Sequence, residues 1–76
     1  MVRPNPFQHQ AIFELENMET TDGLFELFDI SGRLISQQNF SGKQFELKRN
    51  DLKSGMYFYK ISDNGKNINS GKIIVN

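Results

Sequence analysis

Residues 52–65 read Leu-Lys-Ser-Gly-Met-Tyr-Phe-Tyr-Lys-Ile-Ser-Asp-Asn-Gly and include the most strand-like stretch of the chain. Residues 56–62 contain three consecutive aromatic residues, Tyr57-Phe58-Tyr59, and a run this rich in aromatic residues before a turn predicts a β-strand. The Asn64-Gly65 pair suits a type I′ turn, in which both central residues take a positive φ. The pattern therefore predicts a hairpin that leads into a last strand over 66–75.

A second spacing lies at the entrance of that strand. Leu52 precedes Tyr57 by five residues, across Gly55. In Greek-key sandwiches a tyrosine placed here sends its hydroxyl back to the upstream main chain and forms a tyrosine corner. Such a corner divides the strand into inward-facing Tyr57, Tyr59 and Ile61 and outward-facing Met56 and Phe58. The alternative is a hairpin strand that merely contains a tyrosine, and in both cases the role is structural.

Earlier segments show the same period between turn residues. We expect strands over 11–16, 24–30 and 33–38 and around 45–47, a loop over 17–23, a turn at 29–32, a break at Ser41-Gly42 and a polar crossing at 48–55. No segment has sustained helical spacing. The expected fold is all-β: a small antiparallel immunoglobulin-like or fibronectin-like sandwich of about seven strands. We expect one domain over 1–76, with a proline-containing entrance at 1–7 and the sandwich at 8–76.

Composition argues against several classes of function. Nine basic and nine acidic residues give zero formal net charge, so the field expected of a nucleic-acid partner is absent. The chain has no cysteine and a single histidine, His9. Glu14 and Glu16 lie on the solvent-exposed face of the strand expected over 11–16, where glutamates usually act as solvating charges and not as an acid/base pair. Asp51 and Asp63 lack the ligand spacing of a calcium loop. We therefore expect no catalytic residue, no metal and no cofactor.

Exposed aromatic rings offer one binding hypothesis. Phe28, Phe40 and Phe58 form a strip that can stack on sugars if all three rings face outward. The alternative interpretation is that these rings cover the open edges of a small core. The chain has no tryptophan, which weakens the sugar-binding hypothesis.

The two ends of the chain carry further motifs. Pro4-Asn5-Pro6-Phe7 is a rigid entrance, because proline fixes φ and removes an amide donor. Such an entrance leads us to expect a piece cut from the C-terminal end of a longer protein. The last strand continues to the final residue as Gly71-Lys72-Ile73-Ile74-Val75-Asn76, and we expect its end to be free for a partner.

Together these motifs resemble the C-terminal sorting domain of the type IX secretion system of Bacteroidetes. The matching blocks occur in order: Pro4-Asn5-Pro6-Phe7, Leu-Phe-Asp-Ile-Ser-Gly-Arg-Leu-Ile at 27–35, 52–57, and Lys72-Ile73-Ile74-Val75. The residues expected to determine the fold are Pro4, Asn5, Pro6, Asp29, Gly32, Leu52, Gly55 and Tyr57. Arg3 stands where the family often has an aromatic residue, and Asn76 where a basic one is common.

The resemblance implies a non-enzymatic sorting signal. It implies that an N-terminal cargo domain in transit through the periplasm is exported by the outer-membrane translocon to the cell surface or the outside. A sortase-like peptidase often removes such a domain afterwards. The residues expected to be recognised are Lys72, Ile73, Ile74, Val75 and Asn76. The alternative is that Ile73 and Val75 complete the core, and both interpretations can hold because alternating residues of a strand face opposite ways.

The position of these residues supports three further expectations. We expect the last strand to lie at or near a sheet edge, where main-chain groups can pair with another chain. We also expect that removing the last five residues abolishes export while the sandwich stays mostly folded, and that a free edge allows a homodimer. The competing hypothesis is a carbohydrate-binding or spacer sandwich of a secreted polysaccharide-degrading enzyme.

Overall fold

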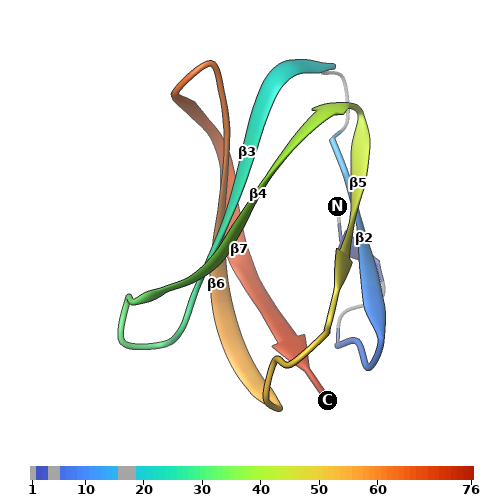
Figure 1. The fold of residues 1–76 in the computed structure, drawn as a ribbon, viewed down its shortest axis with the longest axis vertical. Coiled ribbons are helices and arrows are strands. Elements are labelled where there is room, and N and C mark those ends of the chain that lie inside the picture. Colours follow the sequence, from blue (N-terminus) through green and yellow to red (C-terminus); the bar gives the residue numbers. More distant parts are fainter. Residues whose placement is uncertain (1, 4–5, 16–18) are drawn as a thin grey trace.

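The computed structural model describes residues 2–3, 6–15 and 19–76, and every regular element in this part of the chain is a strand (Figure 1). The strands are β1 (Val2–Arg3), β2 (Gln10–Glu14), β3 (Thr20–Phe28), β4 (Leu34–Gly42), β5 (Gln44–Lys48), β6 (Gly55–Asp63) and β7 (Lys66–Val75). Within the described ranges no helix is long and apolar enough to cross a membrane. Pro4, Asn5 and Glu16, about which the sequence makes predictions, lie outside the described residues.

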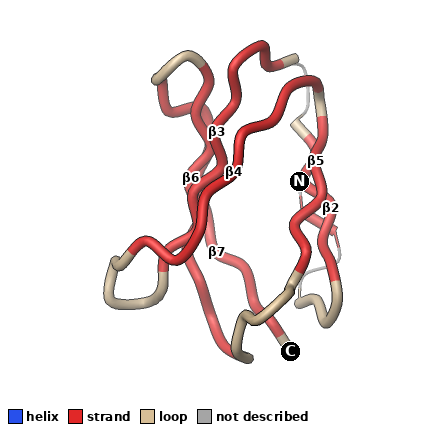
Figure 2. Tube along the Cα trace, in the orientation of Figure 1, coloured by secondary structure: helices blue, strands red, loops and turns tan. Residues whose placement is uncertain are grey.

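Two sheets face each other across a common core (Figures 1 and 2). One sheet has the order β1-β2-β5, and the other has the order β4-β3-β6-β7. All neighbouring strands within the sheets are antiparallel. The all-β, sandwich-like architecture predicted from the sequence is therefore confirmed.

Aromatic rings fill the space between the sheets. Phe13 stacks on Phe45 with ring centroids 4.8 Å apart, and Phe25 lies 4.9 Å from both rings. Removing one such side chain from water contributes roughly 1.5–3 kcal/mol. The buried apolar residues are Phe7, Ala11, Phe13, Leu15, Phe25, Leu27, Phe45, Leu47, Tyr57, Ile61, Ile73 and Val75.

The C-terminal hairpin agrees with the sequence prediction. Asn64 and Gly65 have φ values of 53° and 81°, as a type I′ turn requires. The Asp63 carboxylate also accepts hydrogen bonds from the main-chain amides of Thr21 at 3.3 Å and Asp22 at 3.0 Å. These contacts stabilise the irregular first part of β3, so this strand begins at Thr20, inside the loop predicted over 17–23.

Two other predicted boundaries are wrong. The strand expected over 11–16 is β2, which ends at Glu14. The break expected at Ser41-Gly42 lies inside β4, since this strand continues through Gly42 and β5 begins at Gln44. The chain thus passes between the sheets at Lys43 alone, and the φ of 95° at Gly42 allows this sharp change of direction.

Candidate recognition site

β7 is an edge strand of the four-stranded sheet, as its expected position requires. Its side chains alternate between the core and the outside. Ile73 and Val75 are 0% and 1% exposed, whereas Ile74 is 41% exposed and Lys72 and Asn76 are also exposed. Of the five residues expected to be recognised, three therefore present their side chains to the surroundings, and two belong to the core.

The pairing with β6 determines what surrounds the outward side of β7. Phe58 lies opposite Lys72, and Met56 lies opposite Ile74. Side chains of directly opposed residues are neighbours on the sheet, with Cβ atoms about 4.5–5.5 Å apart. Met56 and Phe58 are exposed, while Tyr57 and Ile61 are buried, so the predicted division of β6 into two faces is confirmed.

Phe7 covers the main chain at the end of β7. Its amide donates to the Ile74 carbonyl at 2.9 Å, and its carbonyl accepts from the Asn76 amide at 2.8 Å. This parallel bridge places Phe7 beside Val75, with the phenyl ring fully buried. The expectation that the end of the strand is free is thus wrong for its main chain at 74–76, where the entrance segment already pairs.

Arg49, which no sequence motif indicates, connects three parts of the chain. Its guanidinium donates to the carbonyl of Gln8 at 3.2 Å, to the carbonyl of Leu52 at 3.0 Å and to the main-chain oxygen of Asn76. It also donates to the Ser54 hydroxyl at 3.2 Å. Arg49 therefore fixes the last residue against both the entrance segment and the connection that leads into β6. No local pattern distinguishes this arginine from an ordinary loop cation.

The predicted corner lies directly beyond this connection. The Tyr57 hydroxyl donates to the Lys53 carbonyl at 2.7 Å, which is the upstream main-chain contact expected of a tyrosine corner. Gly55 has a φ of 146°, a conformation that side-chain-bearing residues avoid. Leu52 packs against the core from the same connection. These three residues fix where β6 starts.

Asp29 organises the turn between β3 and β4. One carboxylate oxygen accepts from the Ser31 amide at 3.0 Å, the Ser31 hydroxyl at 2.6 Å and the Arg33 amide at 3.0 Å. The other oxygen lies 3.2 Å from Arg33 Nε. The bond from the Ser31 hydroxyl is the largest of the effects that hold the pKa of Asp29 below its ordinary value. Gly32 completes the turn with a φ of 91°.

The three aromatic rings considered for sugar stacking do not all face outward. Phe40 turns toward the core, where its ring stacks on Phe45 with centroids 4.4 Å apart. The same ring lies over Gly23, where a Cβ atom would come within 2.7 Å of it. Only Phe28 and Phe58 of the three candidates share the outer face, as opposed residues on β3 and β6. For Phe40 the alternative interpretation, in which the ring covers the edge of the core, is therefore confirmed.

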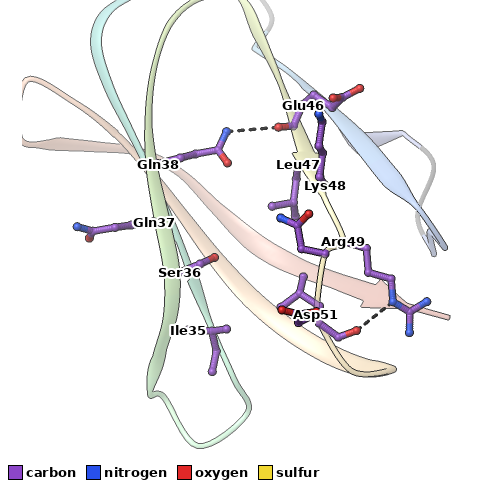
Figure 3. A pocket seen from close by; sticks show the side chains of 11 residues that line it. Ile35, Ser36, Gln37, Gln38, Glu46, Leu47, Lys48, Arg49 and Asp51 are labelled. Carbon is purple, nitrogen blue, oxygen red and sulfur yellow. Dashed lines mark hydrogen bonds between the residues drawn. The ribbon is translucent and has the colours of Figure 1, made fainter.

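A groove of about 470 Å³ separates β4 from β5 on another side of the molecule (Figure 3). Gln38 bridges it by donating to the Glu46 carbonyl at 3.3 Å. Its lining mixes amide, charged and aliphatic groups, and Leu52 is the only predicted site residue among them. Among the residues described, no group of three or more histidine, cysteine, aspartate or glutamate side chains is placed to hold a metal ion.

Comparison with protein families gives a match that spans the chain. The family described as "Secretion system C-terminal sorting domain" matches residues 1–76. No curated protein and no solved structure matches the chain significantly.

Proposed function

Because this chain belongs to the family of type IX secretion C-terminal sorting domains, we propose that the export machinery recognises it through the outward side of β7. Family membership makes the domain a non-catalytic sorting signal that directs an N-terminal cargo to the cell surface or the outside. The observation that carries the proposal is the alternation of β7, whose outward side chains lie at a sheet edge.

The five residues of the proposed recognition segment have two different roles. Lys72, Ile74 and Asn76 are exposed and supply the side-chain contacts. Ile73 and Val75 are buried and hold the strand in place from the core. The residues proposed to determine the fold that presents this segment are Pro4, Asn5, Pro6, Asp29, Gly32, Leu52, Gly55 and Tyr57.

The route of export is also part of the proposal. The cargo reaches the periplasm first, the outer-membrane translocon then binds the folded sorting domain, and a surface sortase-like peptidase removes it. The domain is the substrate of this peptidase. Support for these steps comes from the family to which the chain belongs.

We infer further that residues 1–76 are one domain with a fibronectin-like arrangement. The inference is supported by the strand order, with one sheet of the first, second and fifth strands and another of the fourth, third, sixth and seventh. It is also supported by a tyrosine corner at the entrance of the sixth strand, where immunoglobulin-like sandwiches carry one.

A homodimer through an edge strand is a further proposal. In the described part of the chain β4 and β5 each pair with one neighbour only, so each has a second side to which a strand of another copy can be added.

The experiment fuses residues 1–76 to the C-terminus of a fluorescent reporter that is directed to the periplasm of a Bacteroidetes host. We expect the reporter outside the cell in a host with an active type IX translocon and inside the periplasm in a translocon-deficient strain. A fusion that folds, as judged by the thermal melting of the purified protein, but stays in the periplasm of both strains contradicts the proposal. Equal export from both strains contradicts it as well.

A further inference from the structure

We propose that the outer face of the four-stranded sheet, beside the end of β7, is a docking surface for an apolar and acidic protein surface of the export machinery. We call this region the outer apolar surface; it consists of Phe28, Leu34, Met56, Phe58 and Ile74. The inference rests on the proposed function and extends it from the last strand to residues on three other strands.

Strand register makes this surface continuous. Phe28 on β3 lies opposite both Leu34 on β4 and Phe58 on β6, so the three form one row across three strands. Met56 and Ile74 form the opposed pair at the start of β6 and the end of β7. Single exposed apolar residues are common, but a contiguous patch of large ones marks an interaction surface.

These side chains are accessible. Met56 and Phe58 are 41% and 43% exposed, and Leu34 and Ile74 are exposed to a similar degree. Phe28 is half-buried between its two neighbours in the row. Aromatic residues and methionine are enriched in the centres of protein interfaces, where rigid or adaptable apolar groups exclude water.

Continuity with the recognition strand identifies the occupant. A partner that contacts the exposed side chains of Lys72 and Ile74 also reaches their opposed neighbours Phe58 and Met56, which lie about 5 Å away across the strands. A protein surface of ordinary size that covers the outward side of β7 therefore also covers part of β6. The partner that binds the outer apolar surface is therefore the same export machinery that binds the outward side of β7.

Charges around the surface define the chemistry of that partner. Arg33 forms an ion pair with Asp29, and Lys60 lies opposite Glu26 on the neighbouring strand. Lys72 adds a positive charge at the β7 end of the aromatic row. A complementary partner presents aliphatic or aromatic side chains at its centre and a carboxylate opposite Lys72.

The test uses the reporter fusion in the translocon-active host. In one variant Met56→Thr and Phe58→Thr are combined, since threonine retains a high strand propensity without the apolar bulk. The matched control is Ile35→Thr, because Ile35 is 38% exposed but lines the groove between β4 and β5. A second pair, Lys72→Glu and Lys72→Arg, tests the charge. Circular dichroism and sedimentation of the purified fusions report folding and self-association.

We expect the Met56/Phe58 double variant and Lys72→Glu to lower the exported fraction at least fivefold, while Ile35→Thr and Lys72→Arg export like the wild type. Normal export of the folded double variant overturns the proposal of a docking surface. Normal export of Lys72→Glu overturns the proposal that the partner places a carboxylate opposite Lys72. A wild-type dimer that the double variant dissociates assigns the surface to a second copy and also overturns the proposal. If the unaltered fusion is not exported at all, the proposed function itself fails.

Discussion

Single residues determine where β6 begins and thereby how β7 is held. Tyr57 donates a hydrogen bond to the Lys53 carbonyl, whereas the Tyr59 hydroxyl makes no hydrogen bond to a described residue. We predict that Tyr57→Phe lowers the free energy of unfolding by about 0.5–1.5 kcal/mol, the net contribution of one such bond. Urea denaturation measures this change, with Tyr59→Phe on the same strand as the control. Equal effects of the two substitutions contradict the assigned corner.

The main chain at Gly55 gives a second prediction. A Cβ atom added there meets nothing within 4 Å, so the φ of 146° alone makes another residue unfavourable. We predict that Gly55→Ala lowers the free energy of unfolding by about 1–3 kcal/mol through backbone strain. Lys53→Ala, at an exposed side chain of the same connection, is the control and stays near the wild-type value. An unaltered denaturation midpoint for Gly55→Ala refutes the prediction.

Asp29 gives a prediction about pH. Its pKa is lower in the folded state, chiefly through the Ser31 hydroxyl, so its ionised form stabilises the fold. This contribution is complete above the unfolded pKa of about 4 and is lost as pH falls through the lower folded value. We predict that the stability difference between the wild type and Asp29→Asn is constant from about pH 5 to 7 and shrinks below about pH 4. Denaturation curves along this pH series measure it, and a difference independent of pH speaks against the turn contacts.

At the scale of elements, β7 combines a core strand with a recognition strand. Ile73 is fully buried and Ile74 is 41% exposed, although the two residues are chemically identical and adjacent. We predict that Ile73→Ala lowers the free energy of unfolding by about 2–4 kcal/mol. Ile74→Ala, as a surface substitution, changes it by at most about 0.5 kcal/mol. Chemical denaturation distinguishes the two, and similar losses contradict the alternation.

The same alternation means that a truncation of the last strand affects folding as well as recognition. Removing residues 72–76 deletes two core side chains, the bridge to Phe7 and the contact with Arg49. Lost export of such a truncation therefore reports unfolding as much as lost recognition. Single substitutions on the outward side separate these two effects.

Arg49 links the two ends of the chain, because its guanidinium donates to main-chain oxygens of both Gln8 and Asn76. We predict that Arg49→Ala lowers the free energy of unfolding by about 1–2 kcal/mol, because several charge-assisted hydrogen bonds at a half-buried site are lost together. The effect is local, so the amides of Phe7 and Asn76 exchange with solvent faster. Lys48→Ala, at the exposed neighbouring cation, is the control. Hydrogen exchange measures both variants, and unchanged protection at Asn76 contradicts this role of Arg49.

At the scale of the molecule, local sequence patterns predict the strands but do not predict the contacts between residues that are far apart in the chain. Period-two alternation and the Asn64-Gly65 pair are properties of neighbouring residues, so β6, β7 and their turn follow directly from the sequence. The bridge from Phe7 to Val75 joins residues far apart in the chain and has no local signature. The same holds for Arg49, whose partners lie in three segments.

Burial explains the remaining errors. The ring of Phe40 fits over Gly23 only because the register of β3 and β4 places these two residues side by side. Composition identifies Phe40 as a large aromatic residue but not the sheet face to which it turns. For the recognition segment, strand alternation leaves open whether Ile73 and Val75 complete the core, and the structure shows that both are buried.

Two isoleucines test directly whether the folded sandwich is recognised through the outward side of its last strand. Ile74 and Ile35 are 41% and 38% exposed, on edge strands at opposite ends of the same sheet. The measurement is the exported fraction of the reporter fusion carrying Ile74→Asn or Ile35→Asn, with thermal melting to verify that both variants fold. We predict that Ile74→Asn loses most of its export while Ile35→Asn keeps it. Equal export of the two folded variants contradicts the claim.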